Sequence, residues 1–240
     1  MSVASEITRL QNAKASLKSS INAKTDAQHQ ITDETIDEYS DFVDSITSGG
    51  IPSLPDGYTR VSYIQSSGSQ YIDTGYKPNV NTKLNVLGFQ TQAGGGALLG
   101  ARAEGTINRY MLGSYSSSIT FFWGNTNPDN PYIKSSVATG NFVNFIVNNS
   151  SAIFNATKYS NMNVNTFPDY NIYLFAVNTG GTANAFSVGT IGDLKIYENN
   201  TLIHYFMPCY RNSDNEIGFY DIIANEFKTN SGTGSFTYIS

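Results

Sequence analysis

Two carboxylates near the carboxyl-terminal end are the most obvious candidates for catalytic groups. Asp221 and Glu226 stand five residues apart, among aromatic side chains, in the stretch GFYDIIANEFKTNSGTGSF. A glycoside hydrolase needs such a pair, with one carboxyl group of raised pKa facing the second across a cleft. FYDII and EFKTN instead have the composition of two short strands, and Asp221 can hydrogen-bond the backbone near a tight turn at Ala224-Asn225. The pattern therefore favours a hairpin over an acid/base pair.

The remaining side chains that could act as nucleophiles, bases or metal ligands are few. The chain has two histidines, His29 and His204, and one cysteine, Cys209. Metal sites of the His/Cys kind are therefore excluded, and Cys209 is expected to be a small buried hydrophobic residue. His204 stands among aromatic residues in a strand-like run, which favours a structural imidazole. Asp193 and Glu198 are an odd number of residues apart, so a regular strand would point them to opposite faces.

One stretch combines aromatic and amide side chains in the way that a glycan-binding surface does. It is YMLGSYSSSITFFWGNTNPDN, residues 110–130. The candidate ligand-binding residues are Trp123, Tyr110, Tyr115, Asn125 and Asp129. The loop oxygens of Asn125, Asn127, Asp129 and Asn130 could also bind Ca²⁺, although no metal site or cofactor is predicted. The alternative is that Trp123 and a neighbouring phenylalanine belong to the core and that the Asn, Pro and Asp residues only make turns.

From residue 51 onward the sequence has the two-residue period of β-strands. Short runs rich in Tyr, Phe, Val, Ile and Thr, such as KLNVLGF, NFVNFIVNN and YNIYLFAVN, alternate with Gly, Asn, Ser and Pro. Many such strands over roughly 185 residues predict an antiparallel β-sandwich. Asn199-Asn200 fits a two-residue hairpin turn with positive φ at both residues. The expected pairs are Glu198 with Thr201, Ile196 with Ile203, Lys195 with His204, and Leu194 with Tyr205, with His204 on the face of Lys195, Tyr197, Leu202 and Phe206.

The amino-terminal part has a helical period instead. Apolar residues recur at intervals of three and four, the spacing by which one helix packs against another. They are Ile7, Leu10, Leu17, Ile21, Ile36, Tyr39, Val43 and Ile46. A helix this short is marginal alone, so the pattern predicts packing against another helix of this chain or of sister chains. We expect an N-terminal helical segment over residues 1–48, a linker over 49–54 and the sandwich over 55–240.

Charge and hydropathy exclude two classes of partner. The net charge is −5 and the basic residues are scattered, which argues against a nucleic-acid surface. No apolar run approaches the roughly 18 residues that a membrane helix needs. The start, MSVASEITRLQNAK, lacks the basic and apolar blocks of a secretory signal, so none is expected.

Three segments resemble a known family. LPDGYTRVSYIQSSGSQYIDTGYKPN, LLGAR and the stretch from YLFAVNTGG to TNSGTGSF are similar to the laminin-G/concanavalin A-like jelly-roll modules of bacteriophage virion proteins and of gut-bacterial surface proteins. The similarity runs from about Leu54 to the end, and its most specific parts are the paired motifs Gln70–Gly75 and Thr229–Gly234. The N-terminal helical segment resembles those of phage tail and head-fibre proteins, although Thr25-Asp26 replaces the usual Gly-Val step.

The resemblance implies a non-enzymatic bacteriophage structural protein, a head or tail fibre or decoration protein. The N-terminal helical segment would attach it to other virion proteins of the capsid or tail, and three copies would form a homotrimer, assembled in the bacterial host cytoplasm. The lectin-like domain would bind host-surface or mucosal glycans. Glucanases of this fold carry a Glu-x-Asp-x-x-Glu strand, which this sequence lacks. Two alternatives stay open: a bacterial surface or secreted glycan-binding module, and a capsid-decoration protein without a ligand.

Overall fold

A computed structural model describes residues 14–15, 18–19, 53–92, 96–104, 108–115, 117–124 and 132–240. The chain divides into two compact units, residues 1–53 and 54–240, and the boundary falls within the expected linker. In the first unit, Lys14, Ala15, Lys18 and Ser19 are helical. The eight apolar residues of the expected helical seam lie outside the described part of the chain. Among the described residues no helix is long and apolar enough to cross a membrane.

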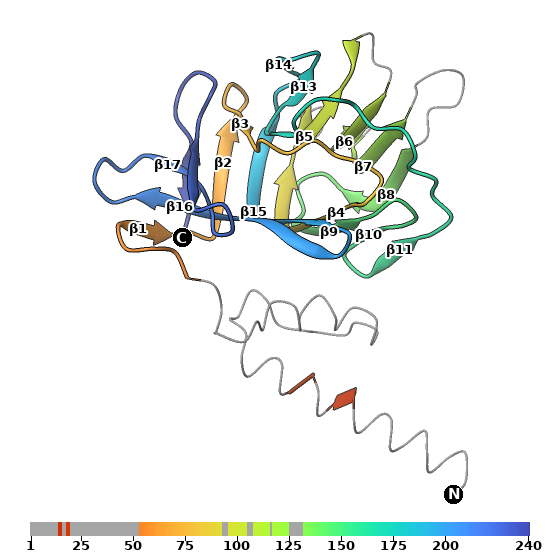
Figure 1. The fold of residues 1–240 in the computed structure, drawn as a ribbon, viewed down its shortest axis with the longest axis horizontal. Helices are drawn as coiled ribbons and strands as arrows, with labels where there is room; N and C mark the ends of the chain where they lie inside the picture. The colour runs from red at the N-terminus through yellow and green to blue at the C-terminus, as the bar shows by residue number, and fades with distance from the viewer. Residues whose placement is uncertain are drawn as a thin grey trace, which may run out of the picture. The chain divides into compact units, whose positions relative to one another are not determined.

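The second unit is built from two β-sheets packed face to face, which confirms the predicted antiparallel β-sandwich (Figure 1). The first sheet contains β1 (Tyr58–Arg60), β2 (Tyr63–Ser67), β4 (Thr82–Thr91), β9 (Val143–Val147), β10 (Ala152–Phe154), β11 (Thr157–Tyr159), β15 (Val188–Glu198), β16 (Thr201–Arg211), β17 (Ile217–Asp221), β18 (Glu226–Thr229) and β19 (Thr237–Ile239). The second contains β3 (Ile72–Asp73), β5 (Ala97–Arg102), β6 (Arg109–Tyr115), β7 (Ser118–Gly124), β8 (Tyr132–Ala138), β12 (Tyr173–Leu174), β13 (Val177–Thr179) and β14 (Thr182–Asn184).

The core lies between the two sheets and is rich in phenylalanine. Alternation along each strand sends every second side chain inward. Phe89 of β4, Phe145 of β9 and Phe206 of β16 come from the first sheet, and Phe121 of β7 comes from the second. All four are fully buried. Burial of one such side chain stabilises a fold by roughly 1.5–3 kcal/mol, so these aromatic residues hold the two sheets together.

The β15–β16 hairpin confirms the predicted turn and corrects the predicted register. Asn199 and Asn200 have φ values of 51° and 62°, and Glu198 pairs with Thr201. A β-bulge beyond Tyr197 then shifts every later pair by one residue. The observed pairs are Ile196 with His204, Lys195 with Tyr205 and Leu194 with Phe206, so the predicted pairs are wrong from the bulge onward. As a result His204 lies on the face of Ile196 and Phe206 rather than on that of Lys195.

The run YNIYLFAVN is two strands rather than one. β12 pairs antiparallel with β5, whereas β13 pairs parallel with the same strand. The chain reverses between them at Phe175, which is fully buried and has a φ of 63°. A bulky residue in the left-handed region is rare, and the surrounding contacts hold it there. Its N–H donates to the carbonyl of Leu98 at 2.6 Å and its ring packs 5.2 Å from that of Phe236.

The two motifs that carry the family resemblance lie against each other. The Ser231 N–H donates to the Tyr71 carbonyl at 2.8 Å, and the Thr233 N–H donates to the Ser69 carbonyl at 3.1 Å. A Cβ atom on Gly232 would lie 2.2 Å from the Ser69 oxygen, so only glycine fits there. These contacts tie the carboxyl-terminal loop to the start of β3 across about 160 residues of sequence.

Candidate functional site

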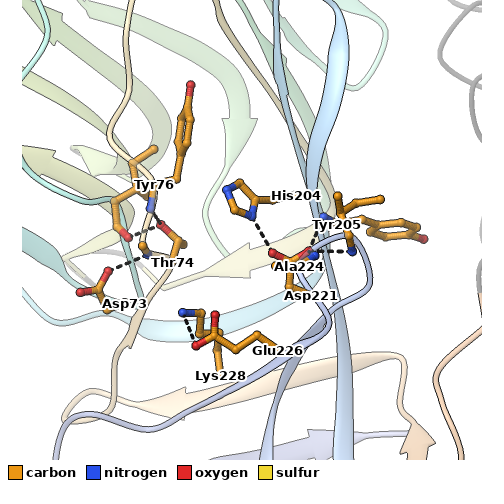
Figure 2. A network of polar contacts seen from close by, with 12 residues as sticks. Asp73, Thr74, Tyr76, His204, Tyr205, Asp221, Ala224, Glu226 and Lys228 are labelled. Atoms are coloured by element: carbon orange, nitrogen blue, oxygen red, sulfur yellow. Dashed lines mark hydrogen bonds and ion pairs between the residues drawn. The ribbon is translucent and has the colours of Figure 1, made fainter.

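The Asp221 carboxylate organises the turn after β17 (Figure 2). It is fully buried, and its Oδ1 accepts hydrogen bonds from the backbone N–H groups of Tyr205, Ile223 and Ala224 at 3.1–3.3 Å. Its Oδ2 lies 2.5 Å from Nδ1 of His204. Burial by itself would raise the pKa of Asp221, but the hydrogen bonds from His204 and the backbone hold it below its ordinary value. The prediction that Asp221 serves the backbone of this turn is confirmed.

Glu226 stands opposite Asp221 on β18 but in a different environment. The two residues are register partners, yet Glu226 is exposed and its carboxylate pairs with Lys228 at 2.9 Å. Figure 2 shows this ion pair separate from the contacts of Asp221 with His204. An acid/base pair needs a carboxyl group whose pKa is raised. The pKa of Asp221 is lowered, and both of its oxygens are occupied by His204 and the turn backbone, so Asp221 is not that acid.

His204 is packed as a structural residue, as the sequence predicts. Its ring stacks on Phe206 with the centroids 5.5 Å apart and meets the Tyr76 ring edge-on at 5.8 Å. Its side chain is 24 % exposed, and Asp221 fixes the Nδ1 side of the ring. The imidazole therefore joins β16 to the turn after β17.

The other buried groups that could react are also part of the framework. Cys209 is fully buried, as predicted, and burial raises the pKa of its thiol to about 12. Asp193 lies on the outer face of the first sheet, where Arg60 donates to both of its oxygens at 3.1 and 2.9 Å. The Tyr205 hydroxyl donates to the same carboxylate at 2.7 Å. Burial and the Asp193 charge both raise the pKa of this phenol.

The predicted ligand-binding residues fall into three groups. Tyr110 and Trp123 point into the core, with 1 % and 8 % of their surface exposed, and Trp123 stacks on Phe121 at 5.7 Å. Neither can form an exposed platform, so their assignment to the ligand surface is wrong and the alternative, a core position, holds. Tyr115 is 54 % exposed and stays a candidate. Asn125 and Asp129 lie outside the described residues.

An exposed aromatic cluster lies on the outer face of the second sheet. It consists of Tyr115 on β6, Phe122 on β7 and Tyr132 on β8, which we call the aromatic patch. The ring centroids lie 6.2 Å apart for Tyr115 and Phe122, 6.0 Å for Tyr115 and Tyr132, and 5.8 Å for Phe122 and Tyr132. Tyr132 is 44 % exposed. The three side chains therefore form one contiguous surface on neighbouring strands.

Strand alternation in the sequence could have placed one residue of this patch, Phe122. In SITFFWG, strand alternation points Ile119, Phe121 and Trp123 to one face and Phe122 to the other. Burial identifies the first set as the core face, so Phe122 lies outside. Tyr132 is the first residue of β8. Its register with Phe122 brings it to the patch.

One arginine lies over the aromatic patch, and a second is its neighbour on the adjacent strand. Arg109 of β6 places its guanidinium 4.8 Å from the Phe122 ring centroid, a cation–π contact. Arg102 of β5 is its direct cross-strand partner. The outer face of the second sheet thus presents flat apolar rings beside cationic hydrogen-bond donors. Rigid Tyr and Phe rings with a few oriented polar groups are typical of binding surfaces.

The matches to known proteins are to solved structures. No protein-family model matches the chain, and no curated protein matches it. Among solved structures, the CBM40 of the Ruminococcus gnavus IT-sialidase shares 13 % identity at a TM-score of 0.42, with 60 % of this chain and 91 % of that chain covered. A mutant of the NanB sialidase from Streptococcus pneumoniae shares 15 % identity at a TM-score of 0.37, with 60 % of this chain and 27 % of that chain covered. Similarity at this level carries no argument about function.

Proposed function

We propose that the β-sandwich is a non-catalytic saccharide-binding module that uses the outer face of β6, β7 and β8. The observation that supports this proposal is the aromatic patch. Three rings from three neighbouring strands stay in contact while Tyr115 and Tyr132 remain about half exposed. A contiguous apolar surface of this kind on an outer sheet face marks an interaction site. Aromatic side chains lose little conformational entropy when a ligand packs on them, which suits them to a flat ligand surface.

The remaining chemistry of the domain is consistent with binding rather than catalysis. Among the described residues, the buried carboxylates Asp193 and Asp221 are each fixed by cations, hydroxyls or backbone N–H groups. The rings of the patch can pack on the apolar C–H face of a pyranose, and the neighbouring arginines can donate to its oxygens.

The test is glycan binding by the full chain and by variants of the patch. Tyr115→Ala and Tyr132→Ala each remove one exposed ring, and each should weaken binding at least tenfold, or about 1.4 kcal/mol. Tyr238→Ala is the matched control, because Tyr238 is also 44 % exposed but lies on β19 and stacks on Tyr210. Equal loss in all three variants, or no binding of the wild-type chain to any glycan on an array, would refute the proposal.

The setting in which the module acts is a further part of the proposal. The sequence resemblance supports display on a bacteriophage particle, with the apolar seam of residues 1–48 joining three copies to one another and to other virion proteins. A bacterial surface or secreted module is the alternative. Light scattering on the full chain measures the number of copies, and a monomer at micromolar concentration would end the trimer proposal.

A further inference from the structure

Two glycines of the first sheet make room for a tyrosine ring on its outer face. Gly88 of β4 and Gly192 of β15 lie opposite each other in the register of these strands. A Cβ atom on Gly88 would lie 2.7 Å from Cε1 of Tyr63, and one on Gly192 would lie 3.2 Å from Cδ1 of the same ring. Glycine inside a strand weakens it. At these two positions it allows the Tyr63 ring to lie directly against the backbone of two neighbouring strands.

Phe142 adds a second ring to this surface. Its ring centroid lies 4.8 Å from that of Tyr63, and Phe142 is 46 % exposed. Val143 and Phe145 of β9 are buried in the core, so alternation places Phe142 and Asn144 on the outer face. We call the two rings the Tyr63–Phe142 platform. It is an exposed aromatic surface on the sheet that does not carry the aromatic patch.

Hydrogen bonds hold the loop that carries Phe142. This loop joins β8 to β9. The Gly140 N–H donates to the Thr91 carbonyl at 2.8 Å, and the side-chain NH₂ group of Gln90 donates to the Gly140 carbonyl. Both contacts tie the loop to β4, the strand that also carries Gly88. A ring held in place in this way loses little entropy when a ligand packs on it.

Two amides on the same face hold opposite hydrogen-bonding groups. Asn144 is exposed, and its Oδ1 accepts from the Gly88 N–H at 2.8 Å, so its NH₂ group is the part that can donate to a ligand. Gln90 follows the buried Phe89 and lies on the outer face. Its NH₂ group binds Gly140, which leaves its Oε1 as an acceptor. Aromatic rings beside an oriented donor and acceptor suit a sugar, which has apolar C–H faces and hydroxyl groups at its edges.

We propose that the Tyr63–Phe142 platform, with Asn144 and Gln90, is a second saccharide site. This inference rests on the proposed saccharide-binding function. The platform lies on the outer face of the first sheet, and the aromatic patch lies on that of the second. Packed sheets are roughly 10 Å apart, so side chains on the two outer faces cannot contact the same sugar ring. One sandwich therefore binds two saccharides and can join two glycan chains.

The experiment counts the saccharides bound per chain. Cellotetraose, maltotetraose, chitotetraose, sialyl-lactose and the strongest ligand from the glycan array are each titrated into the full chain by calorimetry. The wild-type chain should bind two molecules of at least one of these saccharides. The count is made per chain, so association of several copies does not change it.

Variants of the platform then assign the second site. Phe142→Ala should weaken binding at one of the two sites at least tenfold and leave one molecule bound per chain. Asn144→Asp keeps an oxygen for the Gly88 N–H but removes the NH₂ donor, and it should weaken the same site at least fivefold. Tyr115→Ala should remove the other site instead, and the double variant with Phe142→Ala should bind nothing, because distant sites act independently.

Ile223→Ala is the matched control. Ile223 is 44 % exposed, close to Phe142, but lies in the turn after β17, and its replacement should leave both sites unchanged. Thermal midpoints check that each variant is folded. Asn144→Asp provides the test if Phe142→Ala does not fold.

The outcomes separate the two proposals. If the wild-type chain binds one molecule, the second site is overturned. The proposed function still stands if Tyr115→Ala then abolishes binding and Phe142→Ala does not. If two molecules bind but Phe142→Ala and Asn144→Asp leave both sites unchanged, the platform is not the second site and the inference is overturned. If none of the saccharides binds, the proposed function fails and this inference fails with it.

Discussion

Replacement of Asp221 by asparagine tests whether this carboxylate is structural. Asn keeps a carbonyl oxygen that can accept from the N–H groups of Tyr205, Ile223 and Ala224. It has no negative charge for His204, whose Nδ1 lies 2.5 Å from Oδ2 of Asp221 in the wild-type chain. A hydrogen bond to a charged group contributes about 1.5–3 kcal/mol. We therefore expect Asp221→Asn to lower the free energy of unfolding by about 2 kcal/mol.

Thermal unfolding measures this loss. For a domain of about 190 residues, 1 kcal/mol shifts Tm by roughly 2–4 °C, so Asp221→Asn should lower Tm by roughly 4–8 °C at pH 7. Glu226→Gln is the matched control on the opposite strand. Because Glu226 is exposed, its replacement should leave Tm unchanged.

The pH dependence gives the same experiment a second readout. The pKa of Asp221 is lowered in the folded state, whereas an unfolded Asp titrates near a pKa of about 3.9. Its ionised form therefore contributes stability that is complete above roughly pH 5 and is lost as the pH falls through the folded-state pKa. The Tm difference between the wild-type chain and Asp221→Asn should be full at pH 7 and should shrink below about pH 4.

Two results would contradict a structural role for Asp221. One is a Tm for Asp221→Asn within about 1 °C of wild type at pH 7, which would mean that the charge contributes nothing to the fold. The other is release of reducing sugar from a polysaccharide by the wild-type chain that both Asp221→Asn and Glu226→Gln abolish. That second result would restore the acid/base interpretation of the two carboxylates.

Three further predictions concern the framework. Gly232→Ala brings a Cβ to 2.2 Å from the Ser69 oxygen, and we expect a loss of about 2 kcal/mol in chemical denaturation; a stability equal to wild type would show that the loop can move aside. Tyr110→Phe should leave Tm unchanged or raise it, because the buried Tyr110 hydroxyl has no partner among the described residues. Tyr76→Phe should cost about 1 kcal/mol, because it removes a 2.6 Å hydrogen bond. A larger loss of stability in Tyr110→Phe than in Tyr76→Phe would contradict this. The Cys209 thiol should resist alkylation at pH 8 in the folded chain and react once denatured, and rapid native labelling would contradict its burial.

Features that depend on neighbouring residues could be predicted from the sequence. A two-residue period with Gly, Asn and Pro at the breaks predicts strands, and many strands without helical periodicity predict a sandwich. Asn199 and Asn200 specify their own turn because asparagine tolerates positive φ. The binding of nearby backbone by Asp221 was also predictable, since its N–H partners Ile223 and Ala224 are two and three residues away. Such interactions depend on residues that are close together in the sequence.

The face that each side chain takes, and the distant segments that meet, required the folded structure. One bulge beyond Tyr197 moved His204 to the face opposite the predicted one, and the reversal at Phe175 split an apparently continuous strand. The aromatic patch depends on the register of β6, β7 and β8, and the arginine pair depends on that of β5 with β6. Because strand alternation has a period of two, a shift of one residue exchanges inside and outside for the residues beyond it. Register is set by long-range pairing and packing, which local sequence does not contain.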